Sequence, residues 1–306
     1  MNKRPPARIA FLGFGLVGGS IAKALGAELL GGRHPQGGDR PYLAAWTPTG
    51  RGPAQAAADG VIDQAARSLP EALDGSDLVV IAAPAIDAIA LVERLGTDLE
   101  AHMTPGALVT DVTSTKRAIC EAAARTGLPF IGGHPMAGLE TSGYEAAVPG
   151  LFVDRPWVIV VPEHMPTSTA DAVRWLASRC GARPIEMSAG DHDAAAAAVS
   201  HLPLVAAAAL VEAVHGKGGD SWILARSLAA SGWASATRLA LGDPRMGAGI
   251  LATNGAEVAA GVRALRAELD AWLAELERPD GPDAGALERR LAAARAILET
   301  GSNDAL

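Results

Sequence analysis

Short apolar runs alternate with helix-like segments along the first 190 residues or so of the chain. Five runs predict strands: RIAFL at 8–12, YLAAW at 42–46, DLVVIAAP at 77–84, ALVTDV at 107–112 and LPFIGG at 128–133. Ala-rich or amphipathic segments between them, including 86–95 and 116–126, predict helices. Buried strands that alternate with helices indicate an α/β domain with a doubly wound parallel sheet. WVIVVP at 157–162, a helix over 170–180 and RPIEM at 183–187 predict a further strand–helix–strand unit on that sheet.

The strand pattern ceases after Ala189. The remaining pattern predicts helices over 191–214, 221–241, 247–276 and 286–300, with a Pro/Gly/Asp break over 278–285 before a peripheral last helix. We therefore predict two domains, an α/β domain over 1–188 and an all-α domain over 189–306. An Ala-rich helical domain with few aromatic side chains often completes its core by self-association, so we expect a homodimer.

Composition narrows the classes of function. The chain has 306 residues, 49% of them hydrophobic and 20% charged, which excludes global disorder and suits about two domains at roughly 150 residues each. The net charge of -8 and the lack of a basic run argue against nucleic acid as a partner. Cys120 and Cys180 stand far apart, without the spacing of a metal site, so no metal is expected.

Two apolar segments bear on location. The segment at 202–214 is shorter than the roughly 20 residues that cross a bilayer, and the apolar start of the chain is interrupted by glycines that weaken a signal-peptide helix. We therefore expect no membrane association and a cytoplasmic protein.

A glycine-rich turn joins the first strand to the first helix. Residues 13–18 form a GxGxxG motif, with Gly13, Gly15 and Gly18 as its glycines and Leu16 and Val17 before the last. The first glycine permits the tight turn, the second lets the backbone approach a pyrophosphate, and the third allows the helix to pack closely on the strand. The motif, in this context, predicts a dinucleotide site in a Rossmann-type domain.

The end of the second strand bears on which dinucleotide binds. NAD-type sites usually place an acidic residue there for the ribose hydroxyls, but residues 46–51 contain none. Thr47 and Arg51 stand there instead, and a hydroxyl with a cation suits a 2′-phosphate. The residues favour NADP over NAD, although Arg51 could also be a solvated loop cation.

Three polar stretches follow predicted strands or lie in the helical domain: DVTSTK at 111–116, GGHPMAG at 132–138 and SHLP at 200–203. Each has an ordinary interpretation by itself. Ser114 could cap the next helix, His134 could be a loop histidine, and His201 could be a hydrogen-bonded core residue, with Pro203 kinking its helix.

Together these motifs, in this order and followed by Thr237-Arg238 and Asp243-Pro244, resemble the prephenate dehydrogenase family, which includes arogenate and cyclohexadienyl dehydrogenases. The resemblance runs from about Arg8 to Asn254. It implies a Rossmann-type domain followed by a helical dimerisation domain. It also implies an oxidative decarboxylation in tyrosine biosynthesis, in which hydride leaves the hydroxyl-bearing ring carbon for NAD or NADP while the opposite carboxylate departs as carbon dioxide.

The resemblance assigns roles residue by residue. His134 accepts the proton of the ring hydroxyl, and Ser114 orients the histidine or the hydroxyl beside the nicotinamide. His201 is a polar group on the substrate side, supported by Ser200. Arg238 clamps the side-chain carboxylate of the substrate, the alternative being a surface ion pair.

Two positions depart from the pattern of many relatives, and two other functions remain open. Leu204 stands where relatives have a second histidine, and Gly247 where they often have an aromatic residue, so prephenate and arogenate remain alternatives. A two-domain dehydrogenase of the β-hydroxyacid type would need a lysine base, for which the helical domain offers Lys217. A non-catalytic, dinucleotide-binding redox sensor would not need His134, Ser114 and Arg238 to converge.

Overall fold

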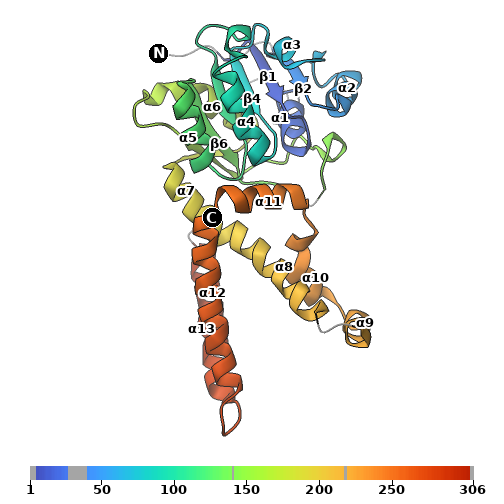
Figure 1. Ribbon diagram of the computed structural model, residues 1–306, viewed down its shortest axis with the longest axis vertical. Coiled ribbons are helices and arrows are strands. Elements are labelled where there is room, and N and C mark those ends of the chain that lie inside the picture. Colours follow the sequence, from blue (N-terminus) through green and yellow to red (C-terminus); the bar gives the residue numbers. More distant parts are fainter. Residues whose placement is uncertain (1–4, 27–39, 140, 217–218, 304–306) are drawn as a thin grey trace. The chain divides into compact units, whose positions relative to one another are not determined.

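The computed structural model describes residues 5–26, 40–139, 141–216 and 219–303 (Figure 1). Lys217 and most of the segment between the first helix and the second strand lie outside the described residues. The chain divides into two compact units, 1–258 and 259–306. This division differs from the predicted boundary at 188/189, which stays a prediction.

Eight strands form one sheet in the order β3-β2-β1-β4-β5-β6-β7-β8. Their bounds are β1 Arg8–Leu12, β2 Tyr42–Trp46, β3 Gln64–Ala65, β4 Leu78–Ile81, β5 Leu108–Asp111, β6 Phe130–Pro135, β7 Pro156–Val160 and β8 Arg183–Glu186. Every strand that the apolar runs predicted is present, and the side chains of β4, β5 and β6 are buried along their whole length. β3 was not predicted, because a two-residue strand has no periodicity to detect.

The parallel sheet is confirmed from β3 to β6, but β7 pairs antiparallel with β6. Residues 157–187 therefore do extend the same sheet, through one antiparallel pair. The reason is the connection: the described residues between β6 and β7 hold only a short 3₁₀ turn, η2 (Tyr144–Ala146), and no crossover helix that would return the chain to the opposite end of the sheet.

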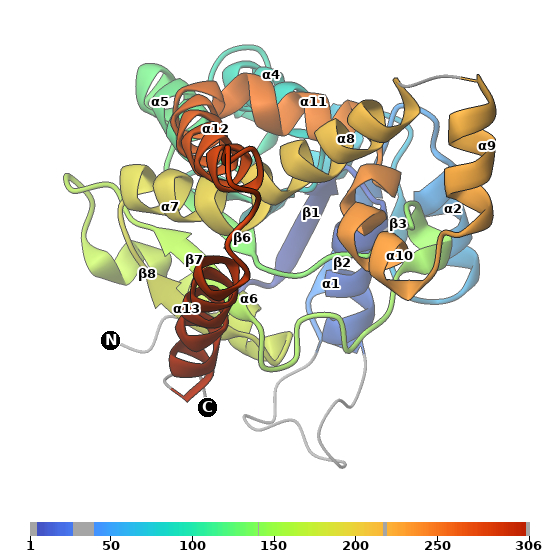
Figure 2. The same ribbon diagram turned by 90° about the horizontal axis from the view of Figure 1, so that it is seen from below.

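Helices cover both faces of this sheet (Figure 2). α1 and α6 pack with Phe11, Ile159 and other inward side chains in one apolar cluster, and α3, α4 and α5 pack in a second cluster on the other face. The helices of the α/β part are α1 Leu16–Gly26, α2 Arg51–Ala58, α3 Leu69–Leu73, α4 Ala85–Leu95, α5 Arg117–Thr126 and α6 Asp171–Arg179, with the 3₁₀ turns η1 Glu100–His102 and η3 Thr167–Ala170.

Among the described residues after β8, all regular elements are helices, as predicted. They are α7 Ala189–Ala196, η4 Ala197–His201, α8 Leu202–His215, α9 Gly219–Ser227, α10 Ser231–Thr237, η5 Arg238–Leu241, α11 Pro244–Thr253, α12 Gly255–Leu276 and α13 Ala284–Asn303. The turn η4 is π-helical, and Pro203 follows it at the start of α8. A proline has no N–H for the helical hydrogen-bond ladder, so the wider turn just before Pro203 is where the predicted kink would be accommodated.

The run from Ala189 to His215 is continuous, so the expectation that the apolar segment is too short to cross a membrane is wrong by length and composition. Only 22% of the most apolar stretch of this helix is buried. Its first part, however, carries His192 and Asp193, which are buried and hydrogen-bonded. Such a helix also fits a surface that another protein chain covers.

The second unit holds most of α12 and all of α13. Within it, Arg290 donates a hydrogen bond from Nη2 to Oε2 of Glu268 at 2.7 Å, and its guanidinium lies 4.3 Å from the centre of the Trp272 ring. These contacts join the two helices across the predicted break at 278–285.

Candidate active site

The first and third motif glycines form the tight turn and the close helix–strand packing that the sequence predicted, and the backbone of the second is open. Gly13 adopts φ +95°, and a Cβ there would lie 2.3 Å from the carbonyl oxygen of Ala82. A Cβ on Gly18 would lie 3.1 Å from the Ala82 side chain, which explains the close approach of α1 to β4. A Cβ on Gly15 would meet nothing within 4 Å, so this part of the backbone is open to a ligand.

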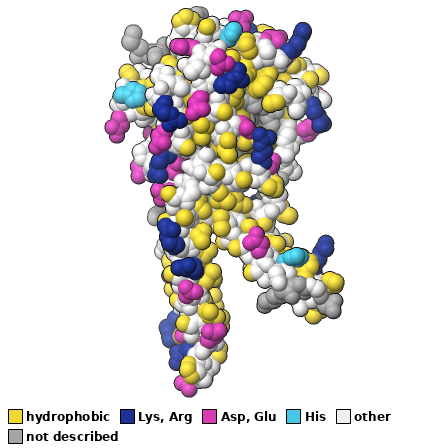
Figure 3. All heavy atoms as spheres, viewed as in Figure 1, with side chains coloured by type: hydrophobic (Ala, Val, Ile, Leu, Met, Phe, Trp, Pro, Cys, Tyr) yellow, Lys and Arg dark blue, Asp and Glu magenta, His cyan; other side chains and the backbone are white. Residues whose placement is uncertain are grey.

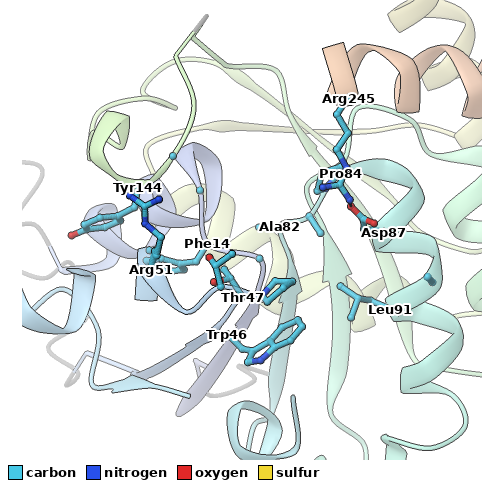
Figure 4. A pocket seen from close by; sticks show the side chains of 18 of the residues that line it. Phe14, Trp46, Thr47, Arg51, Ala82, Pro84, Asp87, Leu91, Tyr144 and Arg245 are labelled. Atoms are coloured by element: carbon cyan, nitrogen blue, oxygen red, sulfur yellow. Dashed lines mark hydrogen bonds and ion pairs between the residues drawn. The ribbon is translucent and has the colours of Figure 1, made fainter. Parts of the chain in front are cut away.

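A cavity of about 670 Å³ opens beside this turn (Figure 4). Thr47 and Arg51 line it, as the sequence predicted, whereas Leu16 and Val17 are half-buried at the start of α1 and are not among its lining residues. Figure 4 shows the side chains around it, which come from the glycine turn, the end of β2, the end of β4, α4, η2 and α11: Phe14, Trp46, Thr47, Arg51, Ala82, Pro84, Asp87, Leu91, Tyr144 and Arg245.

Sequence reasoning missed two sides of this cavity. The Tyr144 ring stacks on Phe14 with ring centres 5.7 Å apart, and its hydroxyl donates to Asp59 at 2.9 Å. Burial and this hydrogen bond raise the pKa of Tyr144 to about 12. At the other side, Arg245 of α11 donates to Asp87 of α4 at 2.7 Å. No local pattern marks these residues, because they come from segments far apart in sequence.

The cavity fits a dinucleotide. The N-terminus of α1, an eleven-residue helix, follows the open backbone at Gly15, and helix N-termini favour phosphate groups. Residues 46–51, at the end of β2, offer a hydroxyl and a guanidinium, Thr47 and Arg51, and no carboxylate; Asp87 and Glu145, from other segments, also line the cavity. The site lies at the carboxyl ends of β1 and β4, which are neighbours in the sheet. The strand order reverses there, because β2 and β3 lie on one side of β1 and the later strands on the other, and this is the usual ligand position in such folds.

A buried ion pair within the DVTSTK segment, residues 111–116, stabilises this loop. The Lys116 ammonium contacts the Asp111 carboxylate, and both side chains are fully buried. The other carboxylate oxygen of Asp111 accepts from the backbone N–H of Gly133 at 3.0 Å. The pair therefore ties the loop that carries half-buried Ser114 to the strand that carries His134.

His134 is buried at the carboxyl end of β6, where its Nδ1 lies 2.8 Å from Nε2 of His192. His192 in turn bonds through Nδ1 to Oδ1 of Asp193 at 2.7 Å. Burial lowers the pKa of His134 well below its usual range, and the charges of His192, Lys116 and His201 act in the same direction. His134 is therefore a neutral imidazole at neutral pH.

Asp193 also caps the N-terminus of α5. Its carboxylate accepts from the backbone N–H groups of Lys116 at 2.7 Å and Arg117 at 2.9 Å, the first groups of that helix. The ordinary interpretation of Ser114 as the cap of this helix is thus wrong, because the cap comes from α7. These hydrogen bonds, together with the one from His192, lower the pKa of Asp193, although burial acts in the opposite direction.

His201 is the second buried imidazole. Asn254 donates from Nδ2 to the backbone oxygen of Asp193 at 2.8 Å and lies 3.2 Å from Nδ1 of His201. Among the described residues, Nε2 of His201 has no hydrogen-bond partner of good geometry. Burial lowers the pKa of His201, although the Asp193 charge and the backbone of Ser114 act in the opposite direction. The adjacent Ser200 is exposed, on the other side of the π turn.

The predicted carboxylate clamp, Arg238, is exposed at the start of η5, and η5 packs against α8, the helix that follows His201. The two departures from the family pattern lie together: a Cβ on Gly247 would be 3.5 Å from Cδ2 of Leu204.

Comparisons with known proteins point in one direction. The family model for the prephenate dehydrogenase nucleotide-binding domain matches residues 50–186, and that for the prephenate dehydrogenase dimerization domain matches residues 188–291. Prephenate dehydrogenase of Bacillus subtilis is 30% identical over 274 residues, which span 88% of this chain and 68% of that protein. Cyclohexadienyl dehydrogenase of Zymomonas mobilis is 29% identical, over 88% of this chain and 86% of that one.

Solved structures agree in fold. Synechocystis arogenate dehydrogenase superposes with a TM-score of 0.76 at 28% identity, covering 96% of this chain and 99% of that one. Prephenate dehydrogenase from A. aeolicus, in complex with hydroxyphenyl propionate and NAD+, gives a TM-score of 0.80 at 22% identity and covers 99% and 98% of the two chains.

Proposed function

Because the chain belongs to the prephenate dehydrogenase family, we propose that this dehydrogenase oxidatively decarboxylates prephenate or arogenate with NADP or NAD as oxidant. The observation that carries the proposal is the buried, neutral His134, which lies with Ser114 at the same edge of the sheet as the glycine turn. Family membership also removes the two other functions, a β-hydroxyacid dehydrogenase and a non-catalytic sensor, from consideration.

Each of the candidate residues has its own role in the proposed reaction. The dinucleotide, held by the glycine turn, supplies the oxidant that takes hydride from the ring carbon. His134 accepts the proton of the ring hydroxyl, because a neutral imidazole in a dry site is a competent base. Ser114 orients that hydroxyl, and the Nε2 side of His201 offers a hydrogen bond to the substrate. Arg238 binds the side-chain carboxylate, and Ser200 supports His201.

For the cofactor we propose a preference for NADP. Thr47 and Arg51 both line the cavity, and the segment that follows β2, residues 46–51, carries no carboxylate to bind a free 2′-hydroxyl.

We also propose a homodimer. Figure 3 shows hydrophobic side chains crowding the surface where α8 and α11 lie in Figure 1. On α8 only Ala207 is buried in the single chain, and one of the two matching family models is a dimerization domain. A second copy over this face would keep the apolar helix from water, in keeping with a cytoplasmic location.

The test is to follow reduced nicotinamide while prephenate and arogenate are each combined with NAD and NADP. We expect turnover with at least one substrate, and a larger kcat/KM with NADP. His134→Gln, which keeps the size of the side chain but not a basic imidazole, serves as the inactive control. Absence of turnover in all four combinations would overturn the proposal.

A further inference from the structure

The sequence motifs left one buried pair unexplained, His192 and Asp193 at the start of α7. His192 is 2% exposed and Asp193 0% exposed, in a helix that is otherwise rich in alanine. Buried polar groups are costly unless they are hydrogen-bonded, and here the bonds run in one line through the His192 ring to His134. The imidazole rings of His134 and His192 meet edge to face, with centres 5.0 Å apart.

The Asp193 carboxylate, at one end of this line, sets the direction of the hydrogen bonds. The Asp193 carboxylate can only accept, so Nδ1 of His192 must carry the proton. When His192 is a neutral imidazole, its other nitrogen is an acceptor, and Nε2 of His192 then accepts from Nδ1–H of His134. With its proton on Nδ1, neutral His134 has a bare lone pair on Nε2.

Asp193 is itself held in place. Both its carboxylate oxygens accept backbone N–H groups from the start of α5, so the carboxylate cannot turn away from His192. The main-chain oxygen of Asp193 accepts a hydrogen bond from the side chain of Asn254, the residue that follows α11. Asp193 is therefore held from two sides. The whole line is therefore anchored at its acidic end by the α/β part of the chain.

We propose that Asp193 and His192 are positioning residues that fix the Nδ1–H tautomer of His134 and so present its unprotonated Nε2 to the substrate hydroxyl. The proposal rests on the proposed function for the identity of that hydroxyl. In the step that it serves, the O–H bond breaks, the proton goes to Nε2 of His134, and the electron pair of that bond forms the second carbon–oxygen bond as the ring carbon is oxidised. The resulting imidazolium is stabilised through His192 by the Asp193 carboxylate.

The deciding variant is His192→Leu, which removes the acceptor for Nδ1–H of His134 but leaves Asp193 in place to cap α5. Neutral His134 then no longer needs its proton on Nδ1, and a proton on Nε2 blocks the base. We expect kcat to fall by about tenfold or more, with dinucleotide affinity unchanged within about twofold. His192→Gln should recover part of this loss, because its amide can accept from His134 and donate to Asp193.

A readout independent of turnover is the tautomer itself, measured by nitrogen–proton correlation NMR of protein labelled with ¹⁵N-histidine, with the His134 signals assigned from the His134→Gln variant. We expect Nδ1–H on His134 in the native protein and a shift toward Nε2–H in His192→Leu. Ser188→Ala is the matched control: Ser188 caps the same helix through Asp191, so its loss should lower the thermal midpoint but leave tautomer and kcat unchanged.

The outcomes separate the two proposals. Nε2–H on native His134, or an unchanged tautomer in His192→Leu, would overturn the inference. A native protein that holds Nδ1–H but oxidises neither substrate would support the inference and count against the proposed function.

Discussion

At the scale of single residues, the protonation of His134 is set by its surroundings. An unperturbed imidazole titrates near neutral pH, which made His134 a candidate base from the sequence. In the structure burial lowers that pKa, and the groups that face the ring from α5, α7 and η4, namely Lys116, His192 and His201, add no negative charge beside it. The residue type was predictable, but its pKa was not.

This environment predicts the pH dependence of the reaction. Protonated His134 cannot accept a proton, and its pKa lies well below the usual 6.5, so kcat/KM should stay level as the pH falls through 6.5 and decline only at lower pH. The measurement is a kcat/KM profile across the acidic range in which the protein stays folded. An acidic limb centred at or above 6.5 would contradict the assignment of His134 as the base.

A second residue-scale prediction concerns Arg51. Replacing Arg51 by Ala removes a cation from the cavity near the end of β2, so the Kd for NADP should rise by about tenfold or more while that for NAD changes little. Titration with each dinucleotide measures this. Arg94, which lines the same cavity but is paired with Asp98, provides a matched Arg→Ala control. Equal losses for the two dinucleotides would show that Arg51 does not read the phosphate.

A third concerns Arg238. Because a guanidinium binds a carboxylate through two parallel hydrogen bonds, Arg238→Ala should raise the substrate KM by about 30-fold or more, equivalent to roughly 2 kcal/mol or more, with kcat less affected. Arg238→Lys should recover only part of the loss. A lower thermal midpoint with an unchanged KM would instead identify a surface ion pair.

At the scale of elements, the turn between β1 and α1 contains one glycine that we expect to matter for stability, Gly13, and one that we expect to matter for dinucleotide binding, Gly15. Gly13→Ala would place a methyl group 2.3 Å from the Ala82 carbonyl oxygen at a positive φ, so the free energy of unfolding should fall by about 2 kcal/mol or more. Gly15→Ala meets no protein atom within 4 Å, so its stability should change by less than about 0.5 kcal/mol.

The affinity of these two variants completes the prediction. The methyl group of Gly15→Ala points into open space beside the cavity and should weaken dinucleotide binding by about tenfold or more. Denaturant unfolding and dinucleotide titration of the same preparations measure both effects. Native affinity in Gly15→Ala would contradict the assignment of this turn to the pyrophosphate.

At the scale of the whole molecule, the apolar surface of α8 predicts self-association. A carboxylate buried in an apolar interface is costly, so Leu210→Glu should shift the protein from dimer toward monomer. Ile185→Glu, on β8, is the control, because both leucine and isoleucine are 38% exposed in the single chain. Sedimentation velocity measures the assembly. A native protein that sediments as a monomer, or equal effects of the two substitutions, would contradict the prediction.

The same scale explains which features could be predicted. Strand and helix alternation and the glycine turn are local patterns, and the structure reproduces them from β1 to β6. Arg51 and Thr47 follow a strand end directly, so the sequence could place them at the edge of the sheet where they line the cavity; their contact with a dinucleotide stays a prediction. Tyr144 and Arg245, by contrast, reach the cavity from distant segments, and no spacing in the sequence connects them to it.

The sequence alone determined the architecture and made His134 the candidate base, because periodicity, turn chemistry and motif order are properties of neighbouring residues. Only the tertiary structure decided that β7 runs antiparallel, that Leu204 lies beside Gly247, and that Asp193 both caps α5 and ends the line of imidazoles at His134. The last of these joins residues 58 positions apart. Hydrogen-bond direction and burial depend on which groups meet in space, and chain packing rather than local propensity brings them together.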